Sequence, residues 1–250
     1  MNTGAFRVQE HFEHFHVLEN ICERVSRRTW KPANTDYAEL ADGWTAFHFI
    51  EPGGKETDHV REFPEMLQVR DFFRCPIEQL MLYAVRPGTA LHPHRDMSGN
   101  LPFGRLRFHV PIVTNPEVDF VVGGERLDMR PGELWALDTS YEHSVRNRSN
   151  QVRVHFVVEV VANDWVWSLL PKKGVAYYRH LLGFWTVACW VAAKKLRTDR
   201  RFLARNLRAL ARRLSGQWKA SAPVSPLDVG GTRRSGLIDK NEFHSARRTS

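Results

Sequence analysis

Residues 80–96 read LMLYAVRPGTALHPHRD, and this stretch contains the clearest strand signal and the clearest site signal of the chain. An apolar run, 80–85, is followed by the turn sequence RPGT at 86–89 and then by mixed residues. Apolar runs of this length bounded by Pro and Gly are typical of buried strands. The stretch therefore predicts two strands joined by a turn. The polar tripeptide 94–96 would lie at a strand edge, where sites are usually built.

Further strand-like runs extend on both sides of this stretch. The first is WTAFHFI (44–50) and the last is VRVHFVVEV (152–160), with turns such as Asn115-Pro116 and Gly123-Gly124 between them. Many short strands separated by turns predict a β-barrel or a double-stranded β-helix. We therefore expect an all-β core of the jelly-roll, cupin-like type. Two segments, 5–26 and 65–74, are predicted to be helices that pack outside it.

His94 and Asp96 form an HxD pair, and His143 follows His94 by 49 residues, after a second strand-like run at 133–137. Side chains alternate along a strand, so His94 and Asp96 point to the same side. Two imidazoles and one carboxylate are the ligand set of non-haem Fe(II) oxygenases, which leaves other positions open for cosubstrate and oxygen. The motif is weak alone, because most histidines have structural roles.

Two later strands carry basic residues on one face and apolar residues on the other. Arg105, Arg107 and His109 share a face of the first, and Arg153 and His155 share a face of the second. Water-facing sheets normally mix charge signs, so these faces predict a bound anion. A guanidinium can hold a carboxylate through two parallel hydrogen bonds. The alternatives are a solvated basic sheet edge and, for the histidines, a structural role in the core.

Four segments resemble, in order and spacing, the aspartyl/asparaginyl β-hydroxylase family of Fe(II)- and 2-oxoglutarate-dependent dioxygenases. They are RPGTALHPHRD (86–96), RLRFHVPIV (105–113), GGERLDMRPGELWALDTSYEHSVRN (123–147) and VRVHFVVEV (152–160). The resemblance covers about a third of the chain and implies a jelly-roll hydroxylase.

The resemblance also implies iron ligands and a reaction. The ligands would be His94, Asp96 and His143. The implied enzyme uses O2, converts 2-oxoglutarate to succinate and carbon dioxide, and hydroxylates an unactivated C–H bond. The protein would supply open coordination positions and a pocket protected from water.

Three further residues would hold the cosubstrate by the same resemblance. Arg153, ten residues after His143, would pair with the distal carboxylate of 2-oxoglutarate, and Arg107 and His109 would help to hold it. His92 offers a competing ligand set, because His92 and His94 form an HxH pair that suits zinc or a cupin-type metal. This alternative ranks second to the HxD set.

The branch of the family that the chain resembles most indicates its substrate class. Animal enzymes that hydroxylate peptide aspartate look similar but have glycine where Asp96 stands. This chain is closer to bacterial members such as the proline cis-hydroxylases, and the lipid A acyl-chain hydroxylases share its HRD and RxH motifs. An amino acid or aminoacyl substrate is therefore the leading expectation, and a membrane lipid or glycolipid is the alternative. A non-catalytic cupin-like binding module is a third interpretation, which the complete triad disfavours.

Charge is divided unevenly along the chain. Residues 1–165 carry 18 Lys and Arg against 24 Asp and Glu, a net charge of −6, whereas 166–250 carry 18 against 4, a net of +14. We expect the dioxygenase domain at 1–165, a basic amphipathic helical extension at 166–220 and a disordered tail at 221–250.

The extension begins with an uncharged run, LLGFWTVACWVAA (181–193), which at 13 residues is shorter than the roughly 20 that cross a bilayer. Arginine-rich residues 194–213 follow, with leucines at helical spacing. The first interpretation is helices that pack on the barrel or on a dimer partner. The second is a helix on an anionic membrane surface, supported by Trp185 and Trp190. Nucleic-acid binding ranks last, because no base-reading module accompanies the charge.

The three cysteines, Cys22, Cys75 and Cys189, are widely spaced and odd in number, which indicates neither a disulfide framework nor a zinc knuckle. The N-terminal residues lack the pattern of a cleavable signal. We therefore expect a cytoplasmic protein that is soluble or peripherally bound to the inner face of the membrane.

Overall fold

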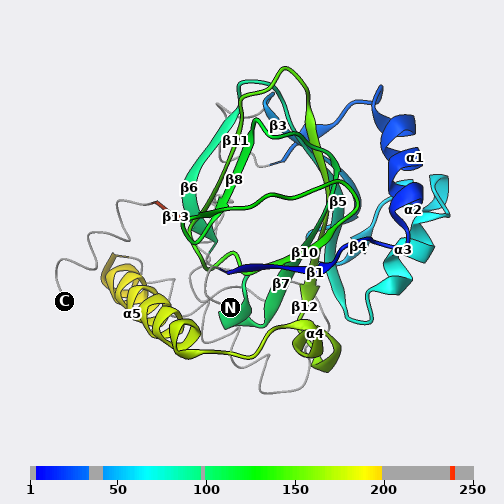
Figure 1. Cartoon of the computed structure of the whole chain (residues 1–250). Coiled ribbons are helices and arrows are strands. Elements are labelled where there is room, and N and C mark those ends of the chain that lie inside the picture. The colour runs from blue at the N-terminus through cyan, green and yellow to red at the C-terminus, as the bar shows by residue number, and fades with distance from the viewer. Residues whose placement is uncertain (1–3, 34–41, 97–98, 199–236, 240–250) are drawn as a thin grey trace.

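The computed structural model describes residues 4–33, 42–96, 99–198 and 237–239. Two antiparallel sheets face each other and enclose a central space, and helices lie outside them (Figure 1). This is the expected jelly-roll architecture, and the prediction of an all-β core with flanking helices is confirmed.

The larger sheet has the strand order β1-β10-β7-β12-β5-β3-β2, and β4 pairs with β3. Its strands are β1 (Ala5–Gln9), β2 (Lys31–Pro32), β3 (Trp44–Glu51), β4 (Lys55–Glu56), β5 (Ile77–Val85), β7 (Arg105–Val113), β10 (Leu134–Leu137) and β12 (Arg153–Val161). The predicted strands at 44–50, 80–85, 105–110, 133–137 and 152–160 correspond to β3, β5, β7, β10 and β12. Strands distant in sequence are neighbours, as in β10-β7-β12-β5, so the sheet gathers residues from the whole domain.

The smaller sheet has the order β13-β6-β11-β8-β9. Its strands are β6 (Ala90–Asp96), β8 (Val118–Val122), β9 (Glu125–Arg126), β11 (His143–Asn147) and β13 (Leu237–Asp239). β11 pairs with β6 so that His143 lies directly opposite His94. The turn before β6 contains Gly88, whose φ of 78° is readily adopted by glycine and rarely by other residues.

The hydrophobic core lies between the larger sheet and the helices. These helices are α1 (Phe15–Val25), α2 (His59–Glu62), α3 (Met66–Phe72) and α4 (Asp164–Leu169). Helix α5 (Val175–Thr198) packs in a separate cluster with Phe103 of the short 3-10 helix η2 (Leu101–Phe103). Alternate residues of β7 and β12, such as Phe108 and Phe156, are fully buried in one cluster with Leu18 and Ile21 of α1. The opposite, polar face of the same strands therefore points into the space between the sheets.

The predicted N-terminal helix at 5–26 is wrong in its first part. Ala5–Gln9 is an edge strand that pairs with β10, and the helix begins only at Phe15. Phe6 and Val8 alternate toward the core, which is the period of a strand, and the helical period starts later. The predicted helix at 65–74 is confirmed as α3.

The C-terminal extension is described only in part. The apolar run 181–193 lies within α5, whereas most of 194–213 falls in residues 199–236, outside the described residues, as does 240–250. Within the described residues, no helix is both long enough and apolar enough to cross a membrane.

Candidate metal and cosubstrate site

A cavity of about 290 Å³ lies between the two sheets. Six residues predicted from the sequence line it: His94, Asp96, His143, Arg107, His109 and Arg153. They come from β6, β7, β11 and β12, which are separated along the chain, so the fold brings the whole predicted set to one cavity.

His94, Asp96 and His143 form a cluster that we call the triad end of the cavity. One potential ligand atom of each residue lies within 4.8 Å of those of the other two. His94 Nε2 is 3.9 Å from Asp96 Oδ1, and the two imidazole centroids are 4.2 Å apart. The pairing of His94 opposite His143 explains how residues 49 positions apart meet.

Backbone carbonyls orient both imidazoles. His94 Nδ1 lies 2.7 Å from the carbonyl oxygen of His92, and His143 Nδ1 lies 3.0 Å from that of Tyr141. A carbonyl oxygen only accepts, so each Nδ1 donates its proton and each Nε2 keeps its lone pair. Burial, together with His94, lowers the pKa of His143 to about 4, so His143 is neutral at neutral pH. Two imidazole nitrogens and a carboxylate fit Fe(II).

Asp96 and Glu159 share one guanidinium. Arg107 Nη1 is 3.2 Å from Asp96 Oδ2, and Arg107 Nη2 is 3.0 Å from Glu159 Oε2. Burial disfavours the carboxylate of Asp96, but Arg107 and the two histidines outweigh it and hold the pKa of Asp96 below its usual value. Burial also opposes the charge of Arg107, yet Asp96 and Glu159 raise its pKa. The charges at the triad end are thus largely balanced by the protein itself.

Arg153 lies at the other end of the cavity, which we call the arginine end, and it has no acidic partner among the described residues. It is 2% exposed, and its Nη2 donates to Nδ1 of His155 over 2.8 Å. Its Nε is buried without a hydrogen-bond acceptor, and the guanidinium carbon lies 5.1 Å from the centroid of Phe120. Burial lowers the pKa of Arg153 to about 9, so it is still charged at neutral pH. A buried cation of this kind calls for an anion.

Two neutral histidines lie beside Arg153: His109 lines the same cavity, and His155 lines a neighbouring pocket that Arg153 also borders. His155 Nδ1 accepts from Arg153, so the proton is on Nε2, and this nitrogen is buried without a partner in the described part of the chain. His109 Nδ1 is buried without a partner as well. Burial, reinforced by Arg153, keeps the pKa of both imidazoles well below the usual value. Both residues therefore offer unused hydrogen-bonding capacity beside the unpaired guanidinium.

The structure does not support two other expectations from the sequence, those for Arg105 and His92. Arg105 was expected on an anion-binding face, but it is buried in an ion pair with Glu78 at 3.0 Å, which contradicts that prediction. His92, the alternative metal ligand, is exposed and lies outside the triad cluster, and only its carbonyl oxygen contacts His94.

Sequence reasoning missed four residues that line the cavity. They are Glu159, Gln79, Tyr83 and Trp44. Alternation along β12 was the available signal for Glu159, because Arg153, His155, Val157 and Glu159 share one face. Glu159 also pairs directly opposite Arg107 across β12 and β7, and that register is visible only in the folded sheet.

Three solved structures resemble parts of the chain. An oxidoreductase of the 2OG-Fe(II) oxygenase family from Burkholderia pseudomallei has 14% identity, covers 64% of this chain and 85% of its own, and gives a TM-score of 0.47. HygX from Streptomyces hygroscopicus, solved with nickel and 2-oxoglutarate, has 11% identity, coverages of 65% and 84%, and a TM-score of 0.44. The non-haem α-ketoglutarate-dependent epimerase SnoN from nogalamycin biosynthesis has 14% identity, coverages of 70% and 87%, and a TM-score of 0.43.

A family model gives the broader match. No curated protein matches the sequence. Residues 13–163, more than half of the chain, match the model described as aspartyl/asparaginyl beta-hydroxylase. The chain therefore belongs to the aspartyl/asparaginyl β-hydroxylase family, and it is an enzyme that uses Fe(II), 2-oxoglutarate and O2.

Proposed function

We propose that this oxygenase hydroxylates an unactivated C–H bond of an amino acid or aminoacyl substrate, with succinate and carbon dioxide as coproducts. In this proposal His94, Asp96 and His143 hold the metal, and Arg153 holds the distal carboxylate of 2-oxoglutarate. The observation that carries it is the division of one cavity into a metal-binding cluster and a buried, unpaired guanidinium.

The residues at the triad end would prepare the metal site. Fe(II), when bound with 2-oxoglutarate and O2, supplies the oxidising chemistry for C–H cleavage. The carbonyls of His92 and Tyr141 keep both Nε2 lone pairs aimed at the ion. Arg107 keeps Asp96 ionised and fixes one of its oxygens. This leaves three protein ligands and open coordination positions.

The arginine end would orient the cosubstrate. Arg153 offers a guanidinium whose only hydrogen-bond partner among the described residues is a neutral imidazole, so a carboxylate meets no competing acid there. Protonated Nε2 of His155 and the unused Nδ1 of His109 would add hydrogen bonds. With the carboxylate held at this end, the keto acid group can reach the triad end of the same cavity.

The size and charge of the cavity favour an amino acid or aminoacyl substrate over a lipid. About 290 Å³ lies at the lower end of the roughly 300–1,000 Å³ typical of ligand pockets. Glu159 Oε2 accepts hydrogen bonds from Arg107 and Gln79, and no described residue bonds to its Oε1. Trp44 and Tyr83, with ring centroids 5.5 Å apart, line the same cavity. A carboxylate oxygen and aromatic faces suit a substrate ammonium group.

The metal site is tested by anaerobic titration of the purified protein with Fe(II) and 2-oxoglutarate. We expect a weak visible metal-to-ligand absorption band in the native protein and none in the Asp96→Ala variant. If the native protein gives no band, it has no chelating site of this kind, and the cupin-like binding module becomes the better interpretation.

The substrate class is tested by a screen of free and peptide-linked amino acids, scored by succinate release. Glu159→Gln should raise KM for an aminated substrate while KM for 2-oxoglutarate changes little, because the glutamine keeps the shape and loses the charge. An equal rise in the KM values for both compounds would show that Glu159 does not specifically bind the substrate.

A membrane lipid or glycolipid is the alternative substrate, and the basic extension is the feature that favours it. It predicts succinate release with lipid vesicles and none with soluble amino acids. Removing the extension is a poor test, because His180 of α5 stacks on Tyr141, two residues before His143. Point changes on the outer surface of α5 avoid this difficulty.

A further inference from the structure

Helix α5 has two apolar faces, and only one of them packs on the barrel. The inner face is made of buried residues: Tyr177, Phe184, Val187, Ala188 and Val191. Phe184 contacts Phe103 of η2, with ring centroids 5.9 Å apart, and Trp185, which borders the inner and the outer face, lies 5.3 Å from the same ring. This packing fixes the helix against the barrel and leaves its opposite side for another contact.

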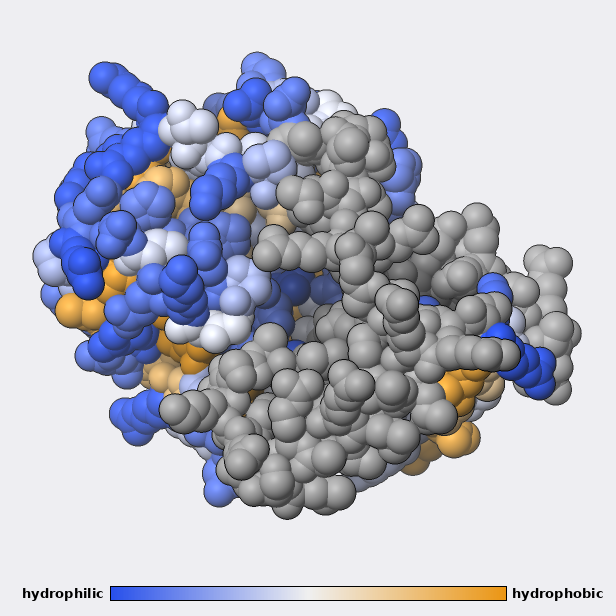
Figure 2. Space-filling view, turned by 180° about the vertical axis from the view of Figure 1, so that it is seen from behind, coloured by the Kyte–Doolittle hydropathy of each residue, from blue (hydrophilic) through white to orange (hydrophobic). Residues whose placement is uncertain are grey.

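The opposite side carries an exposed apolar row that we call the outer stripe. Its members recur at helical spacing and are Val175 (78% exposed), Tyr178 (57%), Leu182 (71%), Trp185 (39%) and Leu196 (45%). The other exposed large apolar residues of the described chain are scattered: Leu67 lies in α3, Val113 at the end of β7 and Val152 in the loop before β12. In Figure 2 the hydrophobic colour of α5 appears at the lower right beside hydrophilic residues. Concentration of such residues on one helix marks an interaction surface.

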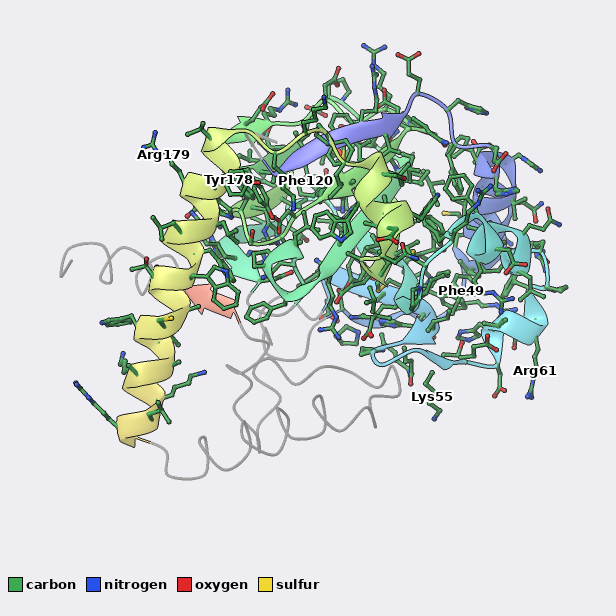
Figure 3. All side chains as sticks on the ribbon, turned by 90° about the horizontal axis from the view of Figure 1, so that it is seen from below. Phe49, Lys55, Arg61, Phe120, Tyr178 and Arg179 are labelled. Atoms are coloured by element: carbon green, nitrogen blue, oxygen red, sulfur yellow. The ribbon has the colours of Figure 1, made fainter. Side chains whose placement is uncertain are left out.

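The charge around the outer stripe has one sign. The segment from 172 to 197 contains six cations and no aspartate or glutamate: Lys172, Lys173, Arg179, Lys194, Lys195 and Arg197. Arg179 and Arg197 are exposed on the side of the helix that borders the stripe. Figure 3 shows Arg179 projecting from α5 away from the barrel. The partner of this surface is therefore apolar in its centre and negative around it.

This charge disfavours two protein occupants. A second copy would bring its own basic α5 against this one, so cations would face cations in a two-fold pair. Residues 199–219 of the same chain contain Arg200, Arg201, Arg205, Arg208, Arg212 and Arg213 and a single acid, Asp199, so they offer the same repulsion.

We propose that the outer stripe docks on an anionic lipid bilayer, with α5 lying in the plane of the interface. Apolar and aromatic residues would enter the headgroup boundary, while Arg179 and Arg197 reach anionic lipid headgroups. The proposal goes beyond the proposed function, because it holds for a soluble or a membrane-borne substrate.

The inner contacts of α5 make this attachment rigid. His180 Nε2 lies 2.8 Å from Ser140 Oγ, and its ring stacks on Tyr141 with centroids 3.5 Å apart. The carbonyl of Tyr141 accepts the hydrogen bond from His143 Nδ1. A bilayer bound to α5 is therefore connected through packed residues to the turn at Tyr141, directly before His143 and strand β11.

The test is sedimentation of the full chain with vesicles of phosphatidylcholine that contain phosphatidylglycerol, compared with vesicles of phosphatidylcholine alone. We expect binding to the anionic vesicles that weakens as salt is raised. Arg179→Gln should weaken it about fivefold, the effect of one cation near an anionic surface. Leu182→Asp should weaken it at least tenfold, because it places a charge in the apolar contact.

Val152→Asp is the matched control, since it adds the same charge at an exposed valine away from α5. It should leave vesicle binding within about twofold. Circular dichroism and the Fe(II)–2-oxoglutarate absorption band, measured for every variant, should match the native protein, which separates this surface from the active site.

Three outcomes would overturn the proposal. The first is equal binding of native protein to both vesicle types or to neither. The second is equal loss of binding in Val152→Asp and Leu182→Asp. The third is a dimer in analytical ultracentrifugation that Leu182→Asp dissociates, because the stripe would then be a contact between two copies.

Discussion

The triad end and the arginine end of the cavity differ in whether their charged side chains have partners of opposite charge. At the triad end, Arg107 lies between Asp96 and Glu159, so each buried charge has a protein partner. At the arginine end, Arg153 is more deeply buried than Arg107 and, among the described residues, bonds only to neutral His155. In the first arrangement every charge has a protein partner and one carboxylate is in excess, whereas the second leaves a positive charge uncompensated. The difference supports the proposal that Arg107 stabilises the structure and that Arg153 binds an anion.

The comparison also has an energetic consequence for the ligand-free protein. A buried ion pair loses several kcal/mol when one partner is removed, because the remaining charge is left unpaired. Removal of a buried charge that has no partner relieves a penalty instead. The two arginines should therefore respond to the same substitution with opposite changes in stability.

Arg107→Met is expected to have the largest effect. It leaves Asp96 and Glu159 close together without their cation, and should lower the free energy of unfolding of the metal-free protein by about 3–5 kcal/mol. Urea denaturation measures this change. A loss below about 1 kcal/mol would show that the pair is screened by water, and the contrast with Arg153 would then disappear.

Arg153→Met should weaken the binding of 2-oxoglutarate and should not destabilise the fold. Truncating one partner of a buried charge pair costs about 2–5 kcal/mol, so the Kd for 2-oxoglutarate should rise roughly 30-fold or more. Isothermal titration under anaerobic conditions with Fe(II) measures the Kd. The ligand-free variant should also melt at a higher temperature than the native protein. An unchanged Kd for 2-oxoglutarate would show that Arg153 does not bind its distal carboxylate.

Asp138→Asn examines a third buried charge, beside the triad end. Burial raises the pKa of Asp138 to about 6, although the backbone N–H groups of Ser140 and Leu101 donate to it. The folded protein then holds its proton more tightly than the unfolded chain, so native stability falls as pH rises from about 4 through 6. The asparagine variant should lose this slope, so its stability relative to the native protein should be about 2–3 kcal/mol higher at neutral pH than at pH 4. Thermal melts of both metal-free proteins across that range measure the difference.

His155→Phe should give the smallest effect, because it removes a neutral acceptor. Arg153 would lose its only hydrogen bond among the described residues, and 2-oxoglutarate affinity should fall about tenfold. His155→Gln, which keeps an acceptor, should recover part of the loss. Equal losses in both variants would assign the effect to packing against Phe120 and not to the orientation of Arg153.

Local pattern was sufficient for much of the fold and for the main members of the site. The HxD pair, the strand alternation at Arg153 and the turn before His143 are all short-range signals, and they predicted residues that meet in one cavity. Residues 5–9 were wrongly predicted as part of a helix, because Ala5–Gln9 becomes a strand only through its pairing with β10, more than 120 residues away.

The ion-pair partners of the buried arginines could not be predicted from the sequence. The strand that carries Arg105 and Arg107 looked uniformly basic on one face. Glu159 approaches it from the adjacent strand β12, and Glu78 from β5, the next strand beyond β12. Cross-strand partners depend on register, which no single strand encodes. For the same reason, sequence alone did not distinguish the paired Arg107 from the unpaired Arg153.

The alignment of β6 with β11 has a further implication for how the enzyme can be altered. Gly88 N–H donates to the carbonyl of Asn147, and Asn147 N–H donates to that of Thr89, so the ends of the two strands are pinned together. A shift of β6 by one position would turn His94 and Asp96 to the wrong face of the sheet. One residue inserted into the 86–89 turn could therefore produce a well-folded protein that no longer retains iron.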